Sequence, residues 1–439
     1  MKRSNRILLG IGCFALLIIS WAAAVSAQSG AEKQLELMAQ AAAMINDGIY
    51  ISAVPLLEQA AGYNAEHTLA AEDELKTVYL ALIDQRGFHR RYLSLLERQM
   101  NRSDAHPDVF AEAANYYLSI SRLPDALEIL RSGIARTGSE DLKTLYESNR
   151  YVYEAGRSVY EYAAAIHGGY AQVQTDGLWG LARSDGVLLI PCQYSKISTF
   201  SGGRAIVMQE NLIIAVDINN NRVAKLHDRA TDFGNFADDR IPLLIKGVWR
   251  RSTGGFVLGS AEFEQIGMYS GGFAAAKTGG KWGVVDLATN WLIPPEYDAI
   301  IQDELGRSHA RGAVFARRGN MVYLYVNGNR VGDGYDDARP FTDEGFAAVR
   351  QKGKWGFIDT DGSLMIDFIF EDALSFGQHL AAVKIGANWG YIGTSGQIAI
   401  QPVFLEAKSF SNGSAPVLTE RGWQFITLIE YIRGAGLSL

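Results

Sequence analysis

The chain has little cysteine and little proline. Of its 439 residues, 2 are cysteines and 10 are prolines, whereas 46 are glycines. Cys13 lies in an apolar N-terminal run, so only Cys192 remains beyond it, and an intramolecular disulfide or a cysteine-based metal cluster is excluded there. The excess of glycine over proline indicates many tight turns, because glycine reaches positive φ without steric cost. The composition therefore favours β structure that is held together by packing.

Positive charge is also scarce. The chain carries 41 Lys and Arg residues against 48 Asp and Glu residues, which gives a formal net charge of −7. Tight binding to a polyanion requires clustered Lys and Arg, because the affinity comes from counterion release. We therefore expect no nucleic-acid partner and no attraction to anionic lipid.

The N-terminus has the pattern of a secretory signal peptide. Lys2, Arg3 and Arg6 precede an apolar run from Ile7 to Val25, and small residues follow at Ser26 and Ala27. We assign residues 1–27 to this signal and expect an exported protein that is periplasmic, cell-envelope-associated or secreted. The run also approaches the roughly 20 residues that a membrane span needs. An uncleaved anchor is the alternative, and membrane contact is expected only in that case.

No familiar catalytic or metal-binding spacing is present. The 7 histidines are scattered, and the sequence has no zinc-hydrolase pair, nucleophile elbow, phosphate loop or dinucleotide fingerprint. We therefore predict no catalytic, cofactor-binding or metal-binding residues, no cofactor and no enzymatic activity. The remaining alternative is a hydrolase whose site is assembled from distant residues at the centre of the fold.

Two groups of acidic residues could hold a hard cation. Asp217, Asn219, Asn221 and Asp228 fit four positions of a calcium loop, but Arg222 stands where the loop requires glycine, which favours a hairpin turn. The second group is interpreted as solvated loop carboxylates; it consists of Asp333, Asp336, Asp337, Asp343 and Glu344.

Residues 28–167 have apolar residues at helical spacing, which predicts stacked helices. In the clearest pair, Ala113 and Tyr117 line one helix, and Ala126 and Gly133 line the next. The pair resembles a tetratricopeptide repeat, in which small residues let two helices approach closely. An earlier copy has Gly48 at the turn with Ala53 and Ala60 at the small positions. A middle copy keeps Gly87 but has Tyr92 and Gln99 at those positions. The resemblance implies a helical-repeat domain, and an irregular bundle is the alternative.

A Trp-Gly dipeptide recurs in residues 168–430. It occurs at Trp179, Trp282, Trp355 and Trp389, and further anchors at Leu212, Trp249, Met321 and Trp423 complete a series spaced by 33 to 39 residues. Six residues before each anchor stands an apolar residue, and eight before stands alanine in six units. Residues two apart share one face of a strand, and Asn327-Gly328 and Asp361-Gly362 are hairpin turns. We predict about eight units of three short strands each, followed by a tail at 431–439.

These units resemble the WG repeat, which is found in many bacterial proteins; residues 347–359 typify it. The resemblance implies a β-repeat array with no single biochemical activity attached. The expected fold class is an α+β multidomain protein, with an N-terminal all-α, tetratricopeptide-like domain followed by an all-β array. A closed propeller and an open β superhelix both remain possible for that array.

The expected function is an exported, non-enzymatic binding or scaffold protein that mediates protein–protein interactions through both modules. We expect most anchor tryptophans to be core residues, because a large aromatic at a fixed place in each unit holds strands together. The alternative is recognition of cell-envelope glycan or peptidoglycan by exposed aromatics, for which Trp291 and Trp249 are the candidates.

Overall fold

The computed structural model describes residues 30–434, which divide into two units between Tyr146 and Glu147. The predicted signal peptide lies outside the described residues. The division differs from the expected break between residues 167 and 168, because residues 153–163 already supply the strands β1 (Tyr153–Ala155) and β2 (Tyr162–Ala163) to the second unit. Residues 431–434 of the expected tail belong to helix α8 (Ile429–Gly434).

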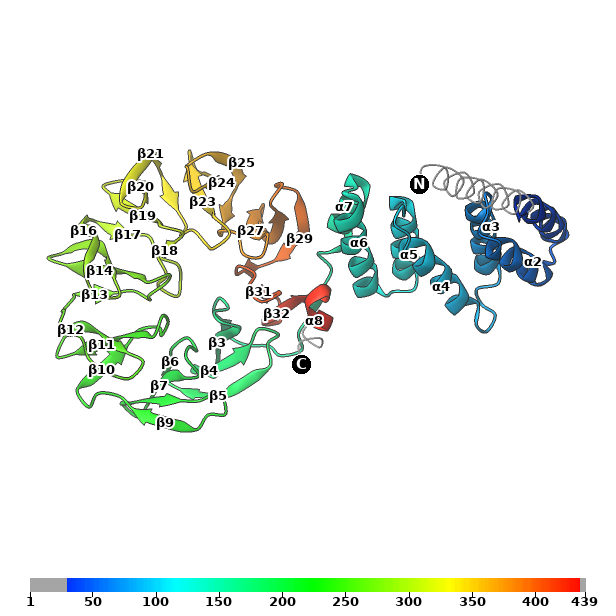
Figure 1. Cartoon of the computed structure of the whole chain (residues 1–439). Helices are drawn as coiled ribbons and strands as arrows, with labels where there is room; N and C mark the ends of the chain where they lie inside the picture. Colours follow the sequence, from blue (N-terminus) through cyan, green and yellow to red (C-terminus); the bar gives the residue numbers. More distant parts are fainter. Residues whose placement is uncertain (1–29, 435–439) are drawn as a thin grey trace, which may run out of the picture. The chain divides into compact units, whose positions relative to one another are not determined.

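The first unit is entirely helical (Figure 1). Residues 30–46 form a helix, and the helices that follow are α2 (Tyr50–Gly62), α3 (Thr68–Ala81), α4 (Phe88–Met100), α5 (Pro107–Ser119), α6 (Leu123–Thr137) and α7 (Glu140–Asn149). The predicted turn glycines Gly48 and Gly87 have φ of 76° and 95°, which only glycine adopts readily. Within residues 30–434, none of the helices combines the length and the apolarity that a membrane crossing needs.

Small residues bring neighbouring helices together as predicted. Ala53, Ala60, Ala113 and Ala126 have no exposed surface. A Cβ atom added to Gly133 of α6 would lie 2.8 Å from side-chain carbons of both Phe110 and Leu142. The contact between α5, α6 and α7 therefore requires a residue without a side chain at position 133.

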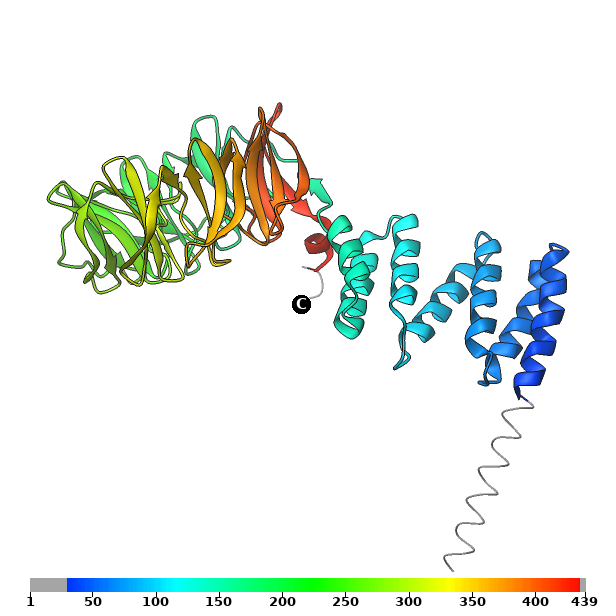
Figure 2. The same ribbon diagram turned by 90° about the horizontal axis from the view of Figure 1, so that it is seen from above.

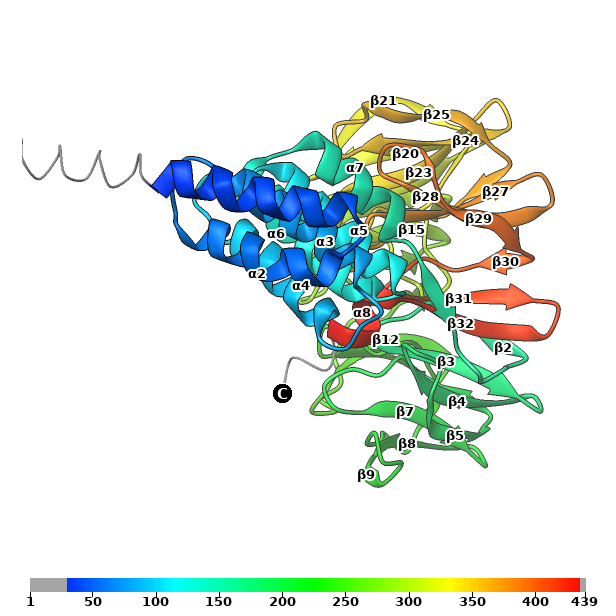
Figure 3. The same cartoon turned by 90° about the vertical axis from the view of Figure 1, so that its right-hand side faces the viewer.

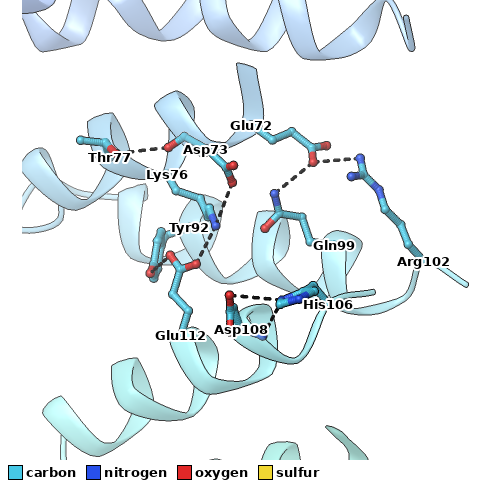
Figure 4. A network of polar contacts seen from close by, with 10 residues as sticks. All are labelled: Glu72, Asp73, Lys76, Thr77, Tyr92, Gln99, Arg102, His106, Asp108 and Glu112. Atoms are coloured by element: carbon cyan, nitrogen blue, oxygen red, sulfur yellow. Dashed lines mark hydrogen bonds and ion pairs between the residues drawn. The ribbon is translucent and has the colours of Figure 1, made fainter. Parts of the chain in front are cut away.

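In the middle helical copy, Tyr92 and Gln99 stand where small residues were expected. Both belong to a polar network between α3, α4 and α5 (Figure 4). The Tyr92 hydroxyl donates to Glu112 at 2.9 Å, and Lys76 forms an ion pair with the same carboxylate at 2.6 Å. Gln99 donates at 3.1 Å to Glu72, a carboxylate with 1% of its surface exposed. Arg98 and Arg102 also pair with Glu72, at 3.2 and 2.8 Å. Here polar side chains replace small residues as the connection between helices.

The second unit contains eight β-sheets, which form the blades of a propeller (Figures 1 and 2). Blade 1 comprises β2, β3 (Tyr170–Thr175), β4 (Leu178–Arg183) and β5 (Leu188–Tyr194). Blade 2 comprises β6 (Lys196–Ile197), β7 (Ala205–Gln209), β8 (Leu212–Val216) and β9 (Arg222–Lys225). Blade 3 comprises β10 (Ala230–Phe233), β11 (Arg240–Ile245) and β12 (Val248–Thr253). Blade 4 comprises β13 (Gln265–Ile266), β14 (Phe273–Thr278), β15 (Lys281–Asp286) and β16 (Trp291–Tyr297).

The remaining four blades follow the same order. Blade 5 comprises β17 (Ala299–Ile300), β18 (His309–Ala310), β19 (Ala313–Arg318), β20 (Met321–Val326) and β21 (Asn329–Tyr335). Blade 6 comprises β22 (Asp337–Ala338), β23 (Phe346–Gln351), β24 (Lys354–Asp359) and β25 (Leu364–Phe370). Blade 7 comprises β26 (Asp372–Ala373), β27 (Leu380–Ile385), β28 (Asn388–Gly393) and β29 (Ile398–Phe404). Blade 8 comprises β30 (Glu406–Ala407), β31 (Ser414–Thr419), β32 (Gly422–Leu428) and β1. Most blades thus gain a two-residue strand beyond the three predicted.

The ring is closed by strands from its two ends. β1 pairs antiparallel with β32, so that Tyr153, Glu154 and Ala155 lie opposite Leu428, Thr427 and Ile426. The first strand of the unit thereby completes the last sheet, and Figure 3 shows β31 and β32 beside β2 and β3. The array is therefore a closed propeller, and the open β superhelix is wrong.

The Trp-Gly dipeptide marks a bulge in each well-formed blade. In blade 1, Trp179 pairs with Tyr194 and Leu181 pairs with Ile190, so Gly180 alone lies opposite three residues of β5. A Cβ atom on Gly180 would lie 2.5 Å from the Ile190 carbonyl oxygen. The same register shift and the same close approach recur at Gly283, Gly356 and Gly390. The glycine is therefore required by the crossing backbone of the outer strand.

Two of the predicted anchors are one residue out of register. The pairs Gln209–Leu212 and Arg318–Met321 close their hairpins in the way that Thr175–Leu178 does in blade 1. The positions equivalent to Trp179 are therefore Ile213 and Val322, rather than Leu212 and Met321. Both units lack the anchor tryptophan, and the residue next to each predicted anchor is also apolar. The sequence alone therefore could not show which of the two residues is the anchor.

Blade 5 keeps the bulge but moves its glycine to the other strand. Tyr323 occupies the position of the dipeptide glycine, and a Cβ atom on the facing Gly334 would lie 2.8 Å from its ring. One of the two crossing residues must lack a side chain, and here it is the residue of the outer strand.

Candidate functional site

Two cavities lie where the short strands and the loops after them face one another. One cavity has a volume of about 690 Å³ and is lined by residues of blades 1 to 5, including Lys196, Asn235 and Met268. The other has a volume of about 750 Å³ and is lined mainly by blades 5 to 8, including Arg339, Lys384 and Lys408. Gln302, Asp303 and Glu304 belong to the walls of both cavities. We call this space the channel.

A loop of blade 5, residues 301–308, reaches into the channel, and we call it the plug. In blade 5, 12 residues separate the short strand β17 from β19. Only 6 residues occupy the equivalent connections of blades 7 and 8. The additional residues explain why the predicted anchor spacing is greatest, at 39 residues, between Trp282 and Met321.

The plug has a defined shape of its own. The Asp303 carboxylate accepts hydrogen bonds from the backbone N–H groups of Leu305 at 3.0 Å and Arg307 at 2.9 Å. The Arg307 Nε atom donates to the same carboxylate at 2.6 Å. Gly306 completes the turn with φ of 89°. Asp303 thus folds the plug into a tight turn that presents Glu304 and Leu305.

Glu304 is held by groups from two other blades. Its carboxylate accepts a hydrogen bond from the Tyr162 hydroxyl at 2.9 Å and another from the backbone N–H of Ala165. It also forms an ion pair with the Lys408 ammonium at 2.7 Å. Residues from blades 1, 5 and 8 therefore meet at one carboxylate.

Leu305 occupies an apolar pocket beside this carboxylate. Its side chain is 4% exposed and belongs to a cluster with Ala164, Ala237 and Met268. The Asn235 amide donates to the Leu305 carbonyl oxygen at 2.9 Å, and the Met268 backbone N–H donates to the Gly306 carbonyl oxygen at 3.0 Å. The channel wall therefore recognises both the side chain and the backbone of the plug.

Lys408 is the most deeply buried charged group among these contacts, with 8% of the residue exposed. Its ammonium lies 4.9 Å from the ring centre of Trp423 and 5.3 Å from that of Tyr162. Burial acts against its charge, but the carboxylates of Glu304 and Glu406 outweigh that effect and raise the pKa of Lys408. Its second partner, Glu406, lies at 3.0 Å. Lys408 is therefore a permanent cation in the channel wall.

Ion pairs also join neighbouring blades of the ring. Arg317 pairs with Asp337 at 2.7 Å, and Lys196 pairs with Asp232 at 2.6 Å. A third pair joins Arg339 and Asp372 at 3.1 Å. Among the residues that the structure describes, Lys384 lines the second cavity without an ion-pair partner. The wall thus offers one uncompensated cation to a ligand.

An unpartnered histidine also lines the second cavity. His309 is 5% exposed, and neither ring nitrogen has a hydrogen-bond partner in the described part of the chain. Its ring lies 4.5 Å from that of Phe273, and burial lowers the pKa of the imidazole. Among residues 30–434, no carboxylate is hydrogen-bonded to this imidazole.

Three of the six anchor tryptophans lie in the interior, and the other three are half-buried. Trp355, Trp389 and Trp423 are buried, at 3%, 8% and 3% exposure, and Trp179 and Trp282 are half-buried. Of the two glycan candidates, Trp291 begins the outer strand β16 and is 36% exposed, and its ring lies nearly perpendicular to that of Phe263. Trp249 is half-buried and pairs with Phe263.

The two predicted acidic groups have ordinary roles. The Asp217 carboxylate accepts backbone hydrogen bonds from Asn219 at 2.9 Å and Asn221 at 2.8 Å, which confirms the hairpin turn. In the second group, Asp337 pairs with Arg317, whereas Asp343 and Glu344 line the second cavity. Over residues 30–434, His, Cys, Asp and Glu side chains nowhere gather in a group of three or more that could hold a metal ion.

Comparison with known families identifies the repeats. The family described as the WG containing repeat matches seven segments: 158–179, 179–212, 260–282, 282–302, 334–355, 355–389 and 389–423. The chain therefore contains WG repeats, and the helical unit has no match of its own. Several matches run from one anchor to the next, so each repeat supplies the last strands of one blade and the first strands of the following blade. The matched segments leave parts of blades 2, 3, 5 and 8 uncovered.

Solved structures share little with this chain. Hsv2p of Kluyveromyces lactis has 11% identity and a TM-score of 0.35, with 62% of this chain and 95% of that chain covered. YCF48 of Cyanidioschyzon merolae has 12% identity and a TM-score of 0.33, with 63% and 99% covered. A eukaryotic initiation factor has 11% identity and a TM-score of 0.39, with 63% and 87% covered. No curated protein matches the chain in sequence.

Proposed function

We propose that this protein is an exported, non-enzymatic binding or scaffold protein, and that the propeller channel holds a segment of a protein partner. The observation that carries the proposal is the plug site, where charged, aromatic and backbone groups of several blades converge on one peptide segment. The WG repeats form the scaffold of this binding surface. The helical unit, which resembles tetratricopeptide repeats, provides a second surface for protein partners.

The chemistry of the channel favours binding over catalysis. Four of its carboxylates are engaged by cations: Glu304 and Glu406 by Lys408, Asp303 by Arg307, and Asp372 by Arg339. A carboxylate held in this way is a poor proton acceptor, because its charge is already stabilised. The hydrolase alternative would need a free acid or base beside a nucleophile.

Affinity capture with full-length variants tests this function. Lys384→Glu reverses a charge of the channel wall, and Lys352→Glu makes the same change on an exposed hairpin outside both cavities. We expect a partner protein retained by the wild type to be lost with Lys384→Glu and kept with Lys352→Glu. Equal retention by both variants would contradict a channel site. Isolation of the mature protein from envelope and culture fractions, with determination of its N-terminal residue, tests the export proposal.

Recognition of cell-envelope glycan is the second candidate, and the exposure of Trp291 favours it. At 36% exposure this ring can stack on a sugar. A peptidoglycan pull-down with Trp291→Ala distinguishes the candidates. Retention of the wild type and loss of the variant would support glycan binding at the outer strand.

A further inference from the structure

The contacts of the plug differ from those of a simple space-filling loop. A loop that only fills space needs large apolar side chains. The plug instead has a carboxylate that pairs with a lysine and accepts hydrogen bonds from a tyrosine hydroxyl and a backbone N–H group. It also places a leucine in a pocket formed by small residues and one methionine. These are the recognition elements of a peptide-binding site: a charge-assisted anchor, an apolar anchor and backbone hydrogen bonds.

The contacts of the plug also allow it to leave the channel. Lys408 retains the Glu406 carboxylate at 3.0 Å when Glu304 departs, so the ring does not acquire an unpaired buried charge. The plug turn is held by Asp303 from within, so it stays folded without the wall. The Glu304 side chain is 28% exposed and borders both cavities, which gives a ligand a route to the anchor.

We propose that the plug is an internal ligand that occupies the partner site, and that the partner presents an acidic tight turn in which glutamate precedes leucine. This inference rests on the proposed function, because it names the segment that the channel binds. The partner's glutamate displaces Glu304 from Lys408 and Tyr162, and its leucine enters the pocket of Ala164, Ala237 and Met268. Because the plug competes for the same site, only a ligand that carries both the glutamate and the leucine binds tightly enough to displace it.

Binding of the plug peptide in trans tests the inference. Deletion of residues 302–307 leaves a connection of the length seen in blades 7 and 8. The probe is a labelled peptide of residues 300–308, followed by fluorescence anisotropy. We expect it to bind the shortened full-length chain at least 10-fold more tightly than the wild type, in which the plug competes. A probe with glutamine in place of Glu304 loses about 10-fold or more in affinity, because a charge-assisted hydrogen bond is lost.

Matched variants locate the binding. In the shortened chain, Lys408→Met removes the anchor and abolishes binding of the peptide, whereas Lys352→Met on the exposed hairpin leaves it unchanged. If the deletion prevents folding, Glu304→Gln in the full-length chain weakens only the plug, and it raises the affinity for the peptide above that of the wild type. A folded shortened chain that does not bind the peptide, or a folded Glu304→Gln chain that binds no better than the wild type, overturns the inference. Partner loss with Lys384→Glu is a separate result, which decides the proposed function alone.

Discussion

The glycine of the Trp-Gly dipeptide can be tested within a single strand. β28 carries Gly390, which follows Trp389, and Gly393 at its end. A Cβ atom at position 390 would lie 2.6 Å from the Ile400 carbonyl oxygen and 2.7 Å from the Pro402 nitrogen. At position 393 its nearest neighbour is the Tyr151 hydroxyl at 3.5 Å, an ordinary contact, and neither glycine has a positive φ. Gly390→Ala and Gly393→Ala therefore add the same methyl group to different surroundings.

The expected magnitude follows from two effects. Replacing glycine by alanine in a strand stabilises the fold by about 0.5–1 kcal/mol, and this gain is common to both variants. The methyl group at position 390 meets backbone atoms, which cannot rotate away, and such overpacking costs about 1–3 kcal/mol. We expect the free energy of unfolding of Gly390→Ala to lie about 1–3 kcal/mol below that of Gly393→Ala.

Guanidinium denaturation followed by tryptophan fluorescence measures this difference in the full-length chain. Within residues 30–434 every tryptophan belongs to the propeller unit, so the signal reports the unfolding of that unit. Equal free energies for the two variants, or a larger loss at position 393, would refute the assignment of the glycine to the bulge.

Three further changes test other parts of the structure. Gly133→Ala should lower helical stability by about 1–3 kcal/mol, because its Cβ atom meets Phe110 and Leu142, whereas Gly62→Ala, with no atom in the way, should not; thermal unfolding followed by circular dichroism compares them. Glu72→Gln should cost about 1–3 kcal/mol by removing the negative charge and one of the two oxygens that pair with Arg98 and Arg102, whereas the exposed Glu97→Gln should change little in the same assay. Tyr269→Phe should raise the free energy of unfolding by about 1–2 kcal/mol at pH 7, because the buried hydroxyl has no hydrogen-bond partner in the part of the chain that the structure describes. Burial raises the pKa of Tyr269 to about 12. An unfolded tyrosine ionises near pH 10, so denaturation between pH 10 and 12 should show the wild type losing about 2–3 kcal/mol relative to the variant.

The repeats could be predicted because each blade needs the same kinds of residue at the same positions. A fixed anchor, an apolar pair before it and a turn after it specify two strands of every blade, and this pattern identified about eight units. The two-residue inner strands were not predictable, since a period of two cannot be recognised in two residues. The register of blades 2 and 5 was wrong for a related reason: without a tryptophan, several apolar neighbours fit the anchor equally well.

The ring closure and the plug lay beyond the sequence pattern. β1 supplies the last strand of blade 8 from more than 250 residues away, and three isolated residues carry no repeat signal. Glu304 and Lys408 were not singled out, because they stand 104 residues apart and meet only when the ring closes. The long spacing between Trp282 and Met321 is the one sign of the plug in the sequence, and the spacing alone does not show which loop of the unit is longer.

Site-specific photo-crosslinking in producing cells shows whether a partner protein enters the channel. A photoreactive amino acid at Asp343 lies in the wall of the second cavity, and the same amino acid at Leu364 lies on the outer strand of the same blade, where the native leucine is 49% exposed. If the channel holds the partner, we expect a covalent protein adduct from position 343 and none from position 364. An adduct from position 364 alone would contradict it and would place the partner on the outer rim.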